Sequence, residues 1–190
     1  MKDVMQIKRE IAKKFSLGQF EAGDILLKEN SDLMPESYRY ECAGDRHFYR
    51  REFQSAVNCY EKSILIDPER PVSRYQYLVG IQEEKESKFV EAFKRYQMAI
   101  DADPEFIDPY VELGGLLVKV GDLKGALQCY RDAVRLDGSA PSNLYNLKAI
   151  LEKMAKTEPD QYGDELAIVV KEYERSVLNK PITPLSDRKW

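Results

Sequence analysis

The chain has 190 residues, of which 43% are hydrophobic and 33% are charged, and its formal net charge is −4. This composition supports a folded core of ordinary size and lacks the long polar runs that are typical of intrinsic disorder. Lysine and arginine are interleaved with aspartate and glutamate. Nucleic-acid binding requires a basic face that neutralises phosphates, so we expect no nucleic-acid partner.

Membrane and metal signals are also missing from the sequence. No apolar stretch approaches the roughly 20 residues that a membrane-spanning helix needs, and the first residues lack the apolar core of a signal peptide. We therefore expect a cytoplasmic protein with no membrane insertion. The three cysteines, Cys42, Cys59 and Cys129, do not have the spacing of metal ligands. We expect no disulfide framework, no metal site and no cofactor.

The first segment, residues 1–35, has the pattern of a helical hairpin. An apolar stripe at helical spacing precedes a Ser-Leu-Gly turn, and residues 19–30 favour a second helix. Gly23 stands where the later segments have alanine. The sequence therefore predicts a divergent N-terminal hairpin.

The next three segments, residues 37–70, 73–106 and 107–140, align with one another without gaps. Each has a glycine in its first half, then an alanine, a tyrosine and a small residue in its second half. These residues are Gly44, Gly80 and Gly114; Ala56, Ala92 and Ala126; Tyr60, Tyr96 and Tyr130; and Ser63, Ala99 and Ala133. The first two glycines are 36 residues apart and the next two are 34 apart, so we place the two extra residues in the connector 69–73. Glycine costs about 1 kcal/mol inside a helix, and its recurrence predicts close contact between paired helices.

The last segment, residues 141–180, is a poorer copy. Lys148 replaces the glycine, and we expect a long connector, residues 156–163, before the last helix. Divergent end repeats are expected, because each end must close the stack. Residues 181–190, which include the single tryptophan, Trp190, form a C-terminal tail.

The Gly-Ala-Tyr-small pattern resembles the tetratricopeptide repeat. The resemblance implies an all-α fold, a right-handed α-solenoid of about five helix-turn-helix hairpins that spans residues 1–180. It also implies a non-enzymatic interaction module that binds a peptide or helix of a partner protein in its concave groove, and that can be chaperone-like. An alternative is a self-assembly element that forms a homo-oligomer through its end hairpins or its tail.

In this family the first helix of each hairpin lines the concave groove. A helical wheel with the glycines turned inward gives the groove residues, which we call the first-helix row. They are Tyr38, Glu41, Asp45, Phe48, Arg74, Tyr77, Ile81, Asp108, Val111, Glu112, Tyr145 and Asn146. The row is aromatic and acidic, so we expect a partner segment with apolar anchors and lysine or arginine nearby. An alternative for each of these residues is packing between neighbouring first helices.

Two other uses of such a chain fit the sequence poorly. Relatives that bind C-terminal peptides of heat-shock chaperones hold the carboxylate with lysine and asparagine, whereas Glu41 and Asp45 stand at the matching positions. His47 is the only histidine and lies on a first helix, where a packing role is expected. No nucleotide-binding, metalloprotease or catalytic-triad motif is present, so we expect no enzyme.

Overall fold

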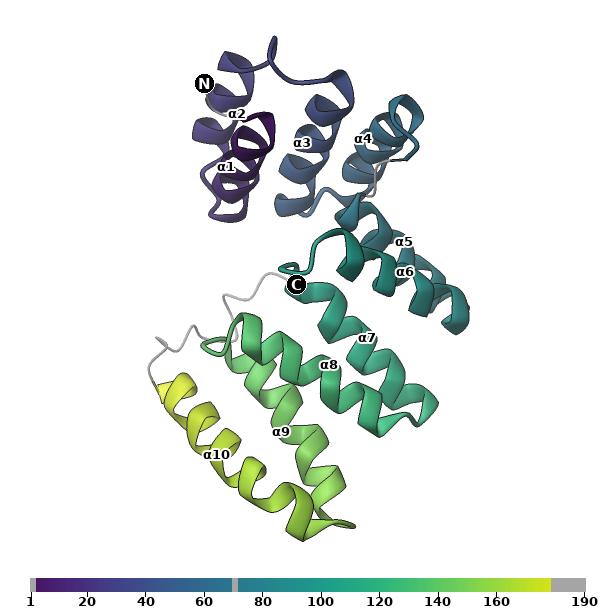
Figure 1. The fold of residues 1–190 in the computed structure, drawn as a ribbon, viewed down its shortest axis with the longest axis vertical. Helices are drawn as coiled ribbons and strands as arrows, with labels where there is room; N and C mark the ends of the chain where they lie inside the picture. Colours follow the sequence, from purple (N-terminus) through teal and green to yellow (C-terminus); the bar gives the residue numbers. More distant parts are fainter. Residues whose placement is uncertain (1–2, 70–71, 179–190) are drawn as a thin grey trace. The chain divides into compact units, whose positions relative to one another are not determined.

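The computed structural model describes residues 3–69 and 72–178, and within these ranges the chain forms ten helices and no strand (Figure 1). The helices are α1 Val4–Ser16, α2 Phe20–Glu29, α3 Glu36–Tyr49, α4 Phe53–Ile66, α5 Ser73–Lys85, α6 Phe89–Ala102, α7 Ile107–Val120, α8 Leu123–Leu136, α9 Pro141–Ala155 and α10 Pro159–Leu178. None of these helices has the length and apolar composition to cross a membrane.

The chain divides into two compact units. The first unit, residues 1–104, contains α1 to α6, and the second, residues 105–190, contains α7 to α10. Within each unit, consecutive helices pair as hairpins, α1 with α2 and so on to α9 with α10 (Figure 1). A single solenoid over residues 1–180 stays a prediction, as does its right-handed sense.

Glycine–tyrosine contacts hold three of the hairpins together. The pairs are Gly44–Tyr60, Gly80–Tyr96 and Gly114–Tyr130, each joining a first helix to its second helix. A Cβ atom added to these glycines would lie 2.3, 2.7 and 2.6 Å, respectively, from the tyrosine Cε1 atom. Real Cβ atoms do not approach a ring this closely, so the helices require glycine at these positions. The tyrosine rings are buried, and the recurring glycine is explained by this contact.

The first hairpin reverses this arrangement. Here the aromatic ring comes from the first helix, as Phe15, and the glycine from the second, as Gly23, whose added Cβ atom would lie 2.3 Å from Phe15 Cε1. Phe15 belongs to a buried cluster with Ile7, Ile11 and other apolar residues. Gly23 therefore fits this hairpin, although the next three hairpins have alanine there.

The last hairpin differs from the prediction at its connector. α9 ends at Ala155 and α10 begins at Pro159, so the expected long connector, residues 156–163, is wrong and only 156–158 join the helices. Proline suits the first turn of a helix, because its fixed φ is helical and no partner is needed for the missing N–H. Gly163, which suggested a loop, lies within α10. The predicted tail, residues 181–190, lies outside the described residues.

Candidate partner-binding surfaces

The first-helix row is largely enclosed on α3. Glu41, Asp45 and Phe48 are only 5%, 2% and 7% exposed. Tyr38, on the same helix, is half-buried. In this unit, α3 therefore does not present an open groove lining, and the contacts of these side chains show what encloses them.

An ion pair joins α3 to the preceding first helix, α1. Lys8 Nζ lies 2.5 Å from Glu41 Oε1, and both side chains are mostly shielded from solvent. The same ammonium group lies 5.6 Å from the centroid of the Tyr38 ring. Two residues of the predicted row thus hold α3 against α1.

Asp45 lies at the centre of a second set of contacts, between α3, α4 and α5. The Tyr60 hydroxyl donates a hydrogen bond to Asp45 Oδ1 over 2.8 Å, and Arg74 Nε lies 3.8 Å from the same oxygen. Burial raises the pKa of the Asp45 carboxyl above its ordinary value, while the charge of Arg74 opposes this shift. Asp45 is therefore a buried structural group with two partners.

Arg74 on α5 contacts a second residue of α3, Tyr49, in addition to Asp45. Its Nη2 donates to the Tyr49 hydroxyl over 2.7 Å, and its guanidinium lies 5.3 Å from the centroid of the Tyr49 ring. Beside it, the rings of Phe48 and Tyr77 pack edge to face with centroids 6.1 Å apart. On α3 and α5, four residues of the row therefore pack between neighbouring first helices, which is the alternative to groove lining. They are Asp45, Phe48, Arg74 and Tyr77.

On the second unit, the residues of the first-helix row are more exposed to solvent. Asp108 and Tyr145 are exposed, Tyr145 to 54%, and Val111, Glu112 and Asn146 are half-buried. Tyr145 stands one repeat after Val111 and therefore occupies the register position that Glu41 occupies on α3. That position is 5% exposed on α3 and 54% exposed on α9. The same position thus changes from a buried contact to a surface side chain along the chain.

Tyr145 contacts α10. Its ring lies 6.0 Å from the ring of Tyr173, and Lys148 Nζ lies 5.9 Å from the Tyr173 centroid. Lys148 also pairs with Glu152 one turn later, at 2.7 Å. The Tyr145 ring therefore has one ring contact, with Tyr173, and more than half of its surface is open to a ligand.

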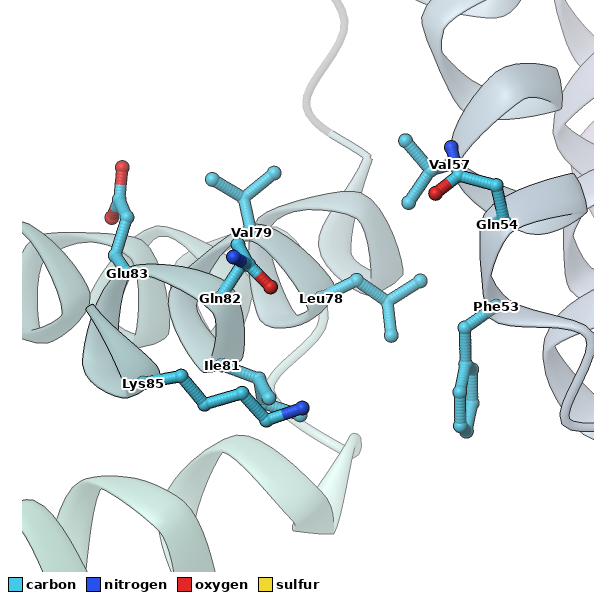
Figure 2. A pocket seen from close by; sticks show the side chains of 9 residues that line it. All are labelled: Phe53, Gln54, Val57, Leu78, Val79, Ile81, Gln82, Glu83 and Lys85. Atoms are coloured by element: carbon cyan, nitrogen blue, oxygen red, sulfur yellow. The ribbon is translucent and has the colours of Figure 1, made fainter.

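A cleft that the sequence did not predict lies in the first unit, between α4 and α5 (Figure 2). It has a volume of about 510 Å³ and a mostly apolar lining. The lining residues are Phe53, Gln54, Val57, Leu78, Val79, Ile81, Gln82, Glu83 and Lys85. Figure 2 shows Leu78 pointing across the cleft toward Val57 and Phe53. Of the predicted row, only Ile81 reaches this cleft.

A comparison with α8 shows why the cleft is open. Val57 on α4 and Leu127 on α8 occupy the same register position, yet Leu127 is 3% exposed and Val57 is half-buried. α5 therefore covers α4 less completely than α9 covers α8. The longer interval of 36 residues between Gly44 and Gly80 falls at this junction and is the sequence signal that accompanies the cleft.

The histidine and cysteine side chains of the described residues were compared with the requirements of metal binding and catalysis. No group of three or more histidine, cysteine or carboxylate side chains there could hold a metal ion. His47 Nδ1 hydrogen-bonds Glu52 Oε2 at 2.5 Å, which lowers the pKa of Glu52. Burial raises the pKa of the Cys59 thiol and raises that of Cys129 to about 11, so neither is a ready nucleophile at neutral pH.

Comparison with known proteins identifies the repeat. The family model of the tetratricopeptide repeat matches residues 107–139, which contain the α7–α8 hairpin with its Gly114–Tyr130 contact. These residues of the chain are similar to the tetratricopeptide repeat. No curated protein matches it in sequence.

Solved tetratricopeptide structures share its fold. A structure of MamA AMB-1 aligns with a TM-score of 0.51 and 13% identity, covering 98% of each chain. A second MamA structure aligns with a TM-score of 0.54 and 16% identity, covering 87% of this chain and 95% of MamA. At these identities the likeness shows the fold alone, and it confirms the predicted all-α solenoid class.

The matched repeat bears on the broad function of the chain. Tetratricopeptide repeats are generally non-enzymatic modules for protein interaction, and the match at residues 107–139 favours a role in protein interaction for this chain. Two surfaces could contact the partner, namely the exposed part of the first-helix row and the α4–α5 cleft.

Proposed function

We propose that this scaffold holds a peptide or helix of a partner protein on the part of the first-helix row that stays exposed. That part, which we call the exposed row, consists of the exposed Asp108 on α7 and Tyr145 on α9, together with the half-buried Val111, Glu112 and Asn146. The observation that supports the proposal is the 54% exposure of Tyr145, an aromatic ring at a position that is buried on α3.

The chemistry of the exposed row favours a partner segment with apolar anchors flanked by lysine or arginine. Asp108 and Glu112 are one helical turn apart on α7, and Val111 lies between them. Tyrosine buries a large area at little cost in rotamer entropy, which makes Tyr145 the expected main contact. A chaperone-like use, in which the chain shields a partner's apolar segment, would rest on the same contacts.

The test requires a defined segment of a partner. Affinity capture followed by mass spectrometry would supply candidate partners, and synthetic segments of them would be titrated by fluorescence anisotropy. Tyr145→Ala should weaken binding by about 10-fold or more, as expected for an aromatic hot spot. Leu65→Ala is the control, because Leu65 is 81% exposed and belongs to α4, which contributes no residue to the exposed row.

Circular dichroism would check that both variants keep the helicity of the parent chain. Equal binding by Tyr145→Ala and Leu65→Ala would exclude the exposed row as the binding surface. Charge reversal, Glu112→Lys, should reduce the affinity for a basic segment and remove its dependence on salt.

A further inference from the structure

Tyr145, the expected main contact of the exposed row, lies in a group with a second tyrosine and a lysine. Its ring centroid is 6.0 Å from that of Tyr173 on α10, and the two rings are tilted by 51°. Lys148 Nζ lies over the Tyr173 ring, 5.9 Å from its centroid. Both helices of the last hairpin therefore contribute to one group of two aromatic rings and one cation.

Lys148 stands at a position where the three preceding hairpins have glycine. By sequence register it is the equivalent of Gly44, Gly80 and Gly114, each of which leaves room for a tyrosine ring. In the last hairpin this position carries a long cationic side chain that is 24% exposed and lies over Tyr173. A charge thus replaces a packing contact at this position.

The charges along α9 follow a fixed order from Tyr145. Lys148 comes three residues after Tyr145 and Glu152 comes seven residues after it, so the three side chains lie along one face of the helix. Lys148 Nζ pairs with Glu152 Oε1 at 2.7 Å. A ligand on the Tyr145 ring therefore meets the ammonium group before the carboxylate.

Lys148 is charged at neutral pH, and its charge acts on Tyr145. The hydrogen bond with Glu152 raises the pKa of the Lys148 ammonium group above 10.5, and electrostatic interactions with Tyr173 and Tyr145 act in the same direction. A second cation on the Tyr145 ring would therefore be repelled, because like charges a few Å apart at a partly shielded surface raise the free energy.

We propose that Lys148 determines which side chain of a partner segment packs on Tyr145, by excluding lysine and arginine from that ring. This inference rests on the proposed function and adds a specificity-determining residue to it. Tyrosine rings attract cations over their faces, and Lys148 already supplies that cation at the Tyr145–Tyr173 pair. The side chain on Tyr145 is therefore neutral and apolar, and the basic residues of the segment bind near Asp108 and Glu112 on α7.

The probe is a peptide selected from a phage-displayed library of random peptides for binding to the full chain, and weakened by Tyr145→Ala. An alanine scan against both chains identifies its anchor, the residue whose loss removes the difference between them. Two fluorescein-labelled versions, one with this anchor and one with arginine in its place, are titrated by fluorescence anisotropy. The measured quantity is the ratio of the two affinities, because a purely structural effect changes both alike.

Lys148→Gln should improve the affinity of the arginine version relative to the anchor version by about threefold to tenfold, because two like charges no longer repel. High salt should reduce this shift. Glu152→Gln should shift the ratio in the opposite direction, because the ammonium group then loses the carboxylate that offsets it. Lys148→Arg should keep the parent ratio. So should the matched control Lys153→Gln, which removes the same charge from an exposed residue of α9 about two turns from Tyr145.

Four results would overturn the inference. The first is an unchanged ratio in Lys148→Gln although Tyr145→Ala weakens the peptide, which leaves the proposed function intact. The second is an equal shift in Lys148→Gln and Lys153→Gln, because net charge would then select the peptide. The third is a selected peptide whose anchor is itself lysine or arginine. The fourth is a library without any peptide that Tyr145→Ala weakens, which would refute the proposed function as well.

Discussion

Two neighbouring glycines on α7 give a direct test of the packing between paired helices. Alanine at either Gly114 or Gly115 gains about 1 kcal/mol of helix propensity, so this contribution cancels between the two variants. The difference lies in the space that each Cβ atom would enter. At Gly114 it would lie 2.6 Å from Tyr130 Cε1, whereas at Gly115 the nearest atom is Tyr130 Oη at 3.9 Å.

The expected magnitude follows from these distances. The Tyr130 ring is 8% exposed, so Gly114→Ala forces a shift within a packed hairpin, and overpacking of this kind costs about 1–3 kcal/mol. Gly115→Ala makes an ordinary van der Waals contact and should stabilise the chain slightly. Gly114→Ala should therefore be less stable than Gly115→Ala by about 1–3 kcal/mol.

Urea unfolding followed by far-ultraviolet circular dichroism measures this difference. With a urea dependence of about 2 kcal/mol per molar, the two midpoints should differ by roughly 0.5–1.5 M. Coincident midpoints would show that the Tyr130 ring moves aside without cost. The requirement for glycine at this register would then need another explanation.

Three further predictions concern charges and the thiol. Burial raises the pKa of the Asp45 carboxyl above 3.8, so the folded state holds the proton to higher pH and the parent chain loses stability as pH rises above 3.8. Asp45→Asn, which does not titrate, should therefore gain stability relative to the parent over that rise in pH, measured by urea unfolding. With a pKa of about 11, Cys129 should react with iodoacetamide about 100-fold more slowly near pH 8 than in the unfolded chain, measured by mass spectrometry. Glu165→Gln breaks a half-exposed pair with Arg131 and should cost at most about 1 kcal/mol, an effect that high salt removes.

The contacts inside each hairpin could be predicted from the sequence because they depend on helix periodicity alone. The recurring Gly80 and Tyr96 positions lie on the facing sides of two helices joined by a short turn, and no other part of the chain needs to be known. The same reasoning fails for the first hairpin. There Phe15 and Gly23 exchange roles, and a search for the usual order finds only a divergent copy.

The openness of the first-helix row could not be predicted in this way. It depends on how closely consecutive hairpins stack, and a helical wheel of one hairpin contains no information on that. Two pairs of opposite charge lie about one repeat apart in the sequence, Lys8 with Glu41 and Arg74 with Asp45. Such pairs are the sequence feature that could have indicated packing between first helices. The α4–α5 cleft is accompanied by a weaker sequence feature, because the interval from Gly44 to Gly80 is two residues longer than the interval from Gly80 to Gly114.

The exchange between Phe15 and Gly23 also bears on protein engineering. Consensus design treats each repeat position as independent and would write alanine at position 23, as in the next three hairpins. The added methyl group would lie 2.3 Å from Phe15 Cε1, in a hairpin whose core residue Ile11 is 0% exposed. The first four hairpins each pair one aromatic ring with one glycine, and either helix of a hairpin can supply the ring. Redesign or recombination of this chain would therefore have to change positions 15 and 23 together.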